Sequence, residues 1–159
     1  MVTYVTIHFV TNNLMSKLQL EAFLPYRLNR IAAAVSQEFR TVYGPHHDLT
    51  IPEWRVLATL GQFSESSAKE IGQHSSMHKT KVSRAVRSLE DRRWLKRSES
   101  EADRREEILT LTALGQRAYR EIVPKALAFE QSILRDLGPE APSLLAAMKR
   151  LEEILHRGS

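Results

Sequence analysis

The chain of 159 residues contains no cysteine. This absence excludes disulfide bonds, thiolate ligands to a metal and cysteine-based sensing of peroxide. A chain that uses no disulfides fits the reducing cytosol best, so we expect a cytoplasmic protein.

Long apolar segments are also missing, since no run approaches the roughly 20 residues that span a bilayer. Met1 to Val10 lack the basic start and the small-residue cleavage site of a signal peptide. We therefore expect a soluble protein with no membrane partner. Residues 1–17 are predicted to form an N-terminal arm, and Met15 offers a second start, so residues 1–14 need not belong to the native protein.

The sequence offers no set of residues typical of an enzyme. It has no glycine-rich phosphate loop, no cofactor motif and no evident pairing of a nucleophile with a base. Ser75 and Ser76 stand near His74 and His78, but serines at a helix start are usually caps. We expect neither catalysis nor a cofactor.

Charge is concentrated in one segment. Residues 76–98 hold eight Lys or Arg and two acidic residues, a net charge of +6 in a chain whose total is +4, so the remainder sums to −2. A basic segment on a slightly acidic body is the pattern of a protein that binds a polyanion with one face.

Apolar residues at three- and four-residue steps predict a helix from Leu20 to Val42, ending near Gly44-Pro45. Two capping boxes follow, in which a hydroxyl and a glutamate three residues later close a helix start. Thr50 with Glu53 begins one helix, and Ser67 with Glu70 begins a short one that ends near His74.

The basic segment is predicted to be a helix from Ser76 to Arg93 with its core face on Val82, Val86 and Leu89. The opposite side combines small hydrogen-bonding residues with cations, as base and phosphate recognition requires. The candidate DNA contacts on it are Ser76, Lys79, Thr80, Lys81, Ser83, Arg84 and Arg87. The alternative is an ordinary solvated basic helix.

Residues 94–98 and 106–111 read as two strands joined by a charged turn at residues 99–105. Short helices, the basic helix from Ser76 to Arg93 as a recognition helix, and a basic hairpin together indicate a mainly α fold with a small β wing, the winged helix-turn-helix. We assign this DNA-binding unit to residues 47–112.

Helices outside that unit carry apolar stripes that it cannot cover. Thr112 caps a long helix reaching Leu137 that Pro124 should interrupt and kink, and after Gly138-Pro139 a last helix runs from Ser143. We assign residues 18–46 and 113–159 to dimerisation, in an intertwined homodimer that presents two reading helices to one face of DNA. The alternative is an intramolecular bundle in a monomer.

The chain resembles the MarR family of bacterial transcriptional regulators over residues 20–157. The stretches 49–57 and 79–90 resemble the family's second and recognition helices, and Asp103-Arg104-Arg105 followed by residues 109–112 and Gly115 resembles its wing. The resemblance implies that Asp103 braces Arg105, which enters the minor groove, and that Arg104 contacts phosphate. Arg93 stands where the family commonly has glycine, which predicts strain if it adopts a left-handed conformation.

The resemblance also implies a dimeric repressor of a palindromic operator, released by a small effector such as an aromatic acid or its coenzyme A thioester. Aromatic residues and arginines suit an aromatic anion. The candidate effector residues are Tyr26, Arg27, Arg30, Tyr43, Trp54 and Arg55. Core packing of Trp54 and ion pairing of the arginines are the alternatives.

Two other functions are compatible with the sequence. A metal-responsive regulator could use His46-His47-Asp48 or His74 with His78, although the spacing of the latter pair across a turn does not guarantee a shared face. A module that binds protein through its winged helix is the other possibility.

Overall fold

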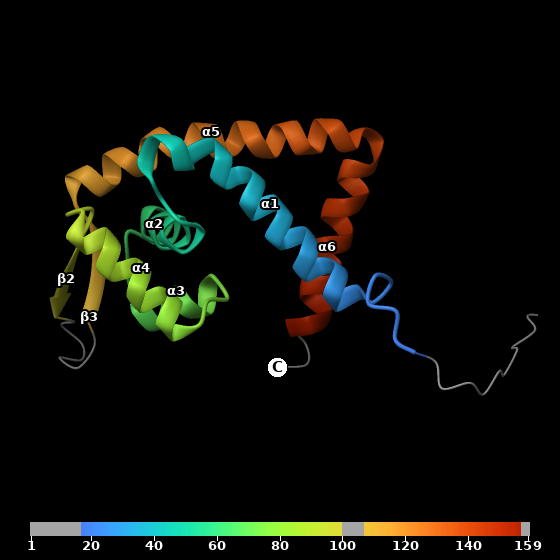
Figure 1. Cartoon of the computed structure of the whole chain (residues 1–159), viewed down its shortest axis with the longest axis horizontal. Helices are drawn as coiled ribbons and strands as arrows, with labels where there is room; N and C mark the ends of the chain where they lie inside the picture. Colours follow the sequence, from blue (N-terminus) through green and yellow to red (C-terminus); the bar gives the residue numbers. More distant parts are fainter. Residues whose placement is uncertain (1–16, 100–106, 157–159) are drawn as a thin grey trace, which may run out of the picture. The chain divides into compact units, whose positions relative to one another are not determined.

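The computed structural model describes residues 17–99 and 107–156. Contacts divide the chain into two compact units, one reaching to Val35 and the other from Ser36 onward. Helix α1 (Leu24–His47) contributes residues to both units (Figure 1). The fold is mainly helical with a small sheet, which confirms the predicted class.

The first unit contains the beginning of α1. The helix starts at Leu24, four residues later than predicted, because a turn precedes it in which the Phe23 amide donates to the Leu20 carbonyl at 3.1 Å. The apolar side chains of Leu24, Leu28 and Ile31 are exposed on this unit. Its apolar stripe therefore has no cover within the described chain.

At its other end α1 continues past Gly44-Pro45 to His47, so the predicted end was wrong. A proline removes one amide donor, and in the last turn the helix can lose that donor without breaking. The Asp48 amide then donates to the Gly44 carbonyl at 2.7 Å, with Asp48 in a left-handed conformation at φ 47.

Helices α2 (Ile51–Phe63) and α3 (Ala68–His74) begin at the two predicted capping boxes. In the first, Thr50 accepts from the Glu53 amide while the Glu53 carboxylate accepts from the Thr50 amide at 2.6 Å. Ser67 and Glu70 repeat this arrangement at α3. Both predictions are confirmed.

Helix α4 (Lys79–Asp91) is shorter than the predicted Ser76–Arg93. Ser76 lies in the preceding turn with φ 53, and His78 is the N-cap, its Nδ1 accepting from the Thr80 amide at 3.3 Å. At the other end, the Arg93 amide donates to the Glu90 carbonyl and the Trp94 amide to the Leu89 carbonyl. This is a Schellman motif, and Arg93 takes its left-handed position at φ 59, as anticipated.

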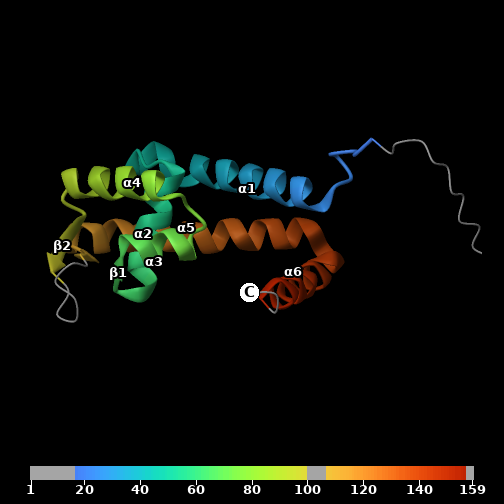
Figure 2. The same ribbon diagram turned by 90° about the horizontal axis from the view of Figure 1, so that it is seen from below.

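Three strands form one antiparallel sheet in the order β1-β3-β2. The hairpin strands β2 (Leu95–Glu99) and β3 (Glu107–Leu111) match the predicted wing. Strand β1 (Glu65–Ser67), visible in Figure 2 beside α3, was not predicted; it pairs Ser66 with Leu109 of β3.

Helix α5 (Ala113–Leu137) begins at Thr112, whose hydroxyl accepts from the Gly115 amide at 3.2 Å. It runs on past Pro124 without the predicted interruption. A Cβ on Gly115 would lie 2.0 Å from the Trp94 carbonyl oxygen, so only glycine permits this approach.

A 3-10 turn, η1 (Gly138–Glu140), connects α5 to helix α6 (Ala141–His156), which starts two residues before the predicted Ser143. Within the ranges that the structure describes, none of the helices has the length and apolar character needed to cross a membrane.

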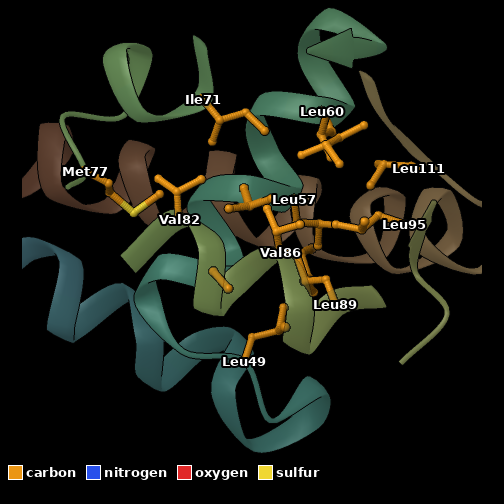
Figure 3. Close-up of a cluster of buried hydrophobic side chains, with 14 of the residues drawn as sticks. Leu49, Leu57, Leu60, Ile71, Met77, Val82, Val86, Leu89, Leu95 and Leu111 are labelled. Atoms are coloured by element: carbon orange, nitrogen blue, oxygen red, sulfur yellow. The ribbon is translucent and has the colours of Figure 1, made fainter. Parts of the chain in front are cut away.

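The core of the second unit lies between α2, α4 and the sheet. Figure 3 shows Leu57 of α2 against Val86 and Leu89 of α4, with Leu95 and Leu111 from the hairpin at one side. Burial of each such side chain stabilises the fold by about 1.5–3 kcal/mol. The core therefore fixes one face of α4 and the base of the hairpin.

Candidate nucleic-acid interface

Helix α4 has the two faces that the sequence predicts. Val82, Ala85, Val86 and Leu89 are buried, with exposed fractions of 4% or less. The exposed residues of α4 are the candidates Lys79, Thr80, Lys81, Ser83, Arg84 and Arg87 together with the acidic Asp91. Ser76, the remaining candidate, is also exposed but stands in the turn before the helix.

The cations of this region fall into two groups. Arg92 and Arg97 are bonded to other parts of the protein. The side chains of the other six, Lys79, Lys81, Arg84, Arg87, Arg93 and Lys96, make no hydrogen bond or ion pair with residues 17–99 or 107–156. The second group is the one free to meet phosphate.

A buried carboxylate of α2, that of Glu53, is hydrogen-bonded to the side of α4 that faces the core. Glu53 of α2 is 5% exposed, and its Oε1 accepts a short hydrogen bond from the Ser88 hydroxyl of α4. Burial raises the pKa of Glu53, but the hydrogen bonds from Ser88 and Thr50 outweigh it and hold the pKa below its ordinary value. The sequence identified Glu53 only as a cap, because its contact with Ser88 is 35 residues away.

Arg92 secures the C-terminal end of the same helix. It donates to the carbonyls of His47 and Asp48 at 2.9 and 2.7 Å, and its guanidinium lies 5.7 Å from the centre of the Trp94 ring. Together with Glu53, it holds α4 against α2 and the end of α1.

The proposed wing residues Asp103, Arg104 and Arg105 lie outside the described residues.

Three of the candidate effector residues belong to the first unit. Tyr26, Arg27 and Arg30 line a surface groove of about 330 Å³, which Glu21 also borders. The Arg30 guanidinium lies 5.8 Å from the centre of the Tyr26 ring. These residues form one cluster.

The other three belong to the second unit. Tyr43 is fully buried and forms an aromatic cluster with Phe39, Trp54 and Phe129, with ring centres 4.9 to 5.6 Å apart. Burial raises the Tyr43 pKa to about 12, against the opposing charges of Arg40 and Arg55, and its hydroxyl has no hydrogen-bond partner among the described residues. Arg55 reaches the Ser75 carbonyl and the Ser36 hydroxyl, both at 3.4 Å.

Three of the four histidines in the proposed metal clusters have other contacts. His47 packs against Trp94 and lies 3.8 Å from a Glu121 oxygen, and burial lowers its pKa. His74 meets the edge of Phe63, and His78 caps α4. No group of three or more potential ligands is arranged for a metal within the described ranges.

Helix α3, the turn at Ser75 and Ser76, helix α4 and the β2–β3 hairpin together define a winged helix-turn-helix domain, a class that binds DNA with its second helix. Comparisons with known proteins agree. Residues 47–106 match the profile of the MarR family. The chain is 27% identical over 128 residues to the uncharacterized HTH-type transcriptional regulator YwoH of Bacillus subtilis (strain 168), covering 80% of this chain and 92% of that protein.

Solved structures give the same answer. A MarR family transcriptional regulator from Silicibacter pomeroyi is 28% identical with a TM-score of 0.73, covering 88% of this chain and 92% of that one. BpsR of Bordetella bronchiseptica, whose DNA binding is regulated by 6-hydroxynicotinic acid, shares the fold at 23% identity and a TM-score of 0.72, covering 86% and 97%. Residues 47–106 thus resemble the MarR family, and the similar proteins are transcriptional regulators, which supports a DNA-binding regulatory role.

Proposed function

We propose that this regulator is a homodimeric repressor that reads a palindromic operator with α4 and the hairpin wing, and that a small aromatic acid releases it. The observation that carries the DNA-reading part is the exposed face of α4. Its cations have no partner among the described residues, while its opposite face is fixed in the core.

In this proposal Ser83, Thr80, Arg84 and Arg87 contact base edges in the major groove, and Lys79 and Lys81 contact phosphates. Ser76 lies beside the helix start and contacts the backbone of DNA. Arg105, braced by Asp103, enters the minor groove, and Arg104 contacts phosphate.

The dimer is supported by apolar surface outside the winged helix. Leu144, Leu145, Met148, Ile154 and Leu155 of α6 are between 42% and 63% exposed, and in the first unit Leu18, Leu24 and Ile31 are at least 54% exposed. A second copy would cover such stripes. We propose that residues 18–46 and 113–159 form the dimerisation region around the DNA-binding unit of residues 47–112.

The effector proposal is supported by the second-unit cluster of Tyr43, Trp54 and Arg55. A buried hydroxyl without a partner costs free energy that an acidic ligand could recover. Arg55 lies close enough to influence the pKa of Tyr43, and a guanidinium suits a carboxylate. The regulation of BpsR by 6-hydroxynicotinic acid, an aromatic carboxylate, makes that compound the first probe.

DNA selection with the purified protein tests the repressor proposal. We expect a palindromic site, and a particle of about twice the chain's 18.2 kDa in sedimentation. With about six phosphate contacts, affinity should fall roughly 10³-fold between 50 and 200 mM salt. A flat salt response or an asymmetric site would contradict this docking.

Arg84→Ala should weaken operator binding by about 1–3 kcal/mol and relax base choice at one position. Arg135→Ala is the matched control, since it removes the same charge from an exposed position in the last turn of α5. Equal effects of the two substitutions would show that α4 contributes charge only.

Effector release is tested by titrating 6-hydroxynicotinate and benzoate into the protein–operator complex. We expect release by at least one of them, and weaker release from Arg55→Met. If neither acid changes DNA affinity or the fluorescence of the protein, the aromatic-acid proposal is wrong and the DNA-reading proposal stands.

A further inference from the structure

One guanidinium connects the reading helix to both strands of the hairpin. Arg97 of β2 donates from Nε to both oxygens of Glu90 at 3.1 Å, and from a terminal nitrogen to Glu107 Oε2 at 2.5 Å. Glu90 lies in the last turn of α4 and Glu107 begins β3. Figure 1 shows the β2–β3 hairpin beside one end of α4.

The two strands of the hairpin are held differently: β3 buries Leu109 and Leu111 and pairs with β1, whereas β2 is packed against the protein only at its base. Leu95 is the one buried residue of β2, at 3% exposure, and the next four residues of that strand are exposed. Arg97 lies in the exposed part of β2, opposite the buried Leu109 of β3. In the described part of the chain it makes the outermost side-chain link between the hairpin and α4.

The charges of the cluster do not suit a phosphate contact. Arg97 faces two carboxylates, so the three groups together carry a net charge of −1. Next to a helix that meets DNA, such a cluster repels phosphate slightly. Attraction for DNA therefore does not explain Glu90, whereas its bond to the hairpin does.

We propose that Arg97 is a positioning residue which, through Glu90, sets the angle between α4 and the β2–β3 hairpin and so makes specific DNA binding depend on both elements together. This inference rests on the proposed function only in that α4 and the hairpin contact DNA at the same time. Arg97 itself need not touch DNA.

Glu90→Gln and Glu107→Gln form a matched pair for the test. Each substitution removes one negative charge, but only Glu90→Gln weakens the link to α4, where it leaves Arg97 one neutral acceptor in place of a carboxylate, because Glu107 and Arg97 both belong to the hairpin. Affinity is measured for the selected operator and for unrelated DNA, at a temperature where circular dichroism shows every variant fully folded.

Positioning predicts that Glu90→Gln weakens operator binding about five-fold, equivalent to about 1 kcal/mol, while binding to unrelated DNA stays the same or rises. Glu107→Gln should change operator binding less than about two-fold. Arg97→Lys, which keeps the charge but loses the forked donor, should behave like Glu90→Gln. A purely electrostatic role predicts the opposite sign, with Glu90→Gln tightening both kinds of DNA.

Hydrogen exchange gives an answer that does not depend on DNA. Amides of β2 and β3 should exchange faster in Glu90→Gln than in Glu107→Gln, with α2 and the core of α4 unchanged. Equal behaviour of the two variants, or faster exchange throughout the core, would overturn the inference. If the wild type bound no DNA at all, the proposed function would fail, and the exchange data would still decide whether this link holds the hairpin.

Discussion

Removing the Glu53 carboxylate tests directly how α2 holds helix α4 in place. This carboxylate caps α2 through Thr50 and at the same time accepts from Ser88 of α4. Glu70 is a matched control, because it closes the same kind of capping box at α3 but lies at the surface and bonds to no other helix.

The expected magnitude follows from the bonds lost. Loss of a helix cap costs about 1 kcal/mol, and a part-buried hydroxyl deprived of its acceptor costs about 1–2 kcal/mol more. Glu53→Ala should therefore lower the free energy of unfolding by about 2–3 kcal/mol, and Glu70→Ala by about 1 kcal/mol.

The pH dependence carries a definite sign. The Glu53 pKa is lower in the folded protein than its ordinary value of 4.5, so the ionised form favours folding. That contribution is complete above pH 4.5 and is lost as the pH falls through the folded value. The difference in unfolding free energy between wild type and Glu53→Gln should be constant from about pH 6 to 8 and shrink below about pH 4.5.

Urea unfolding followed by tryptophan fluorescence measures these differences, since Trp54 is the next residue on α2. Protein concentration must be held fixed, because self-association would add to apparent stability. Two results would refute this role of Glu53. One is an equal loss of unfolding free energy in Glu53→Ala and Glu70→Ala, and the other is a difference between wild type and Glu53→Gln that does not shrink below about pH 4.5.

Three further predictions concern backbone geometry and the buried tyrosine. Gly115→Ala should destabilise the fold by about 2–4 kcal/mol, because its Cβ would meet the Trp94 carbonyl, whereas Gly44→Ala, whose nearest contact is 3.5 Å away, should be neutral or stabilising; thermal unfolding compares the two. Arg93→Gly should stabilise by about 0.5 kcal/mol by relieving a left-handed side chain, and an unchanged or lower melting temperature would contradict that strain. The free energy of unfolding should fall as the pH rises from 10 towards 12, because the raised pKa of Tyr43 favours the neutral hydroxyl in the folded state. In alkaline unfolding, Tyr43→Phe should lack this part of the pH dependence.

Local chemistry made much of the fold predictable. The capping boxes at Thr50 and Ser67 and the two faces of α4 depend on residues within a few positions of one another, whereas the left-handed conformation of Arg93 was raised as a possibility by the family resemblance. Strand β1 was missed because Glu65–Ser67 is only three residues long and becomes a strand through its pairing with β3.

The remaining differences have similar causes. The start of α4 was placed at Ser76 because serine is a favoured cap, whereas the ring nitrogen of His78 performs that role. The bonds from Glu53 to Ser88 and from Arg97 to Glu90 depend on helices and strands already being packed together. Periodicity along the chain carries no signal for such contacts.

The close approach of Gly115 to the Trp94 carbonyl has a mechanical consequence. The first turn of α5 rests directly on the backbone where α4 passes into β2, with no side chain of residue 115 between them. Side chains can absorb a small displacement by changing rotamer, but two backbones in contact cannot. A rotation of α5 must therefore either move the junction between α4 and β2 or break the contact between Gly115 and the Trp94 carbonyl. The contact resists any movement that would bring the two backbones closer together.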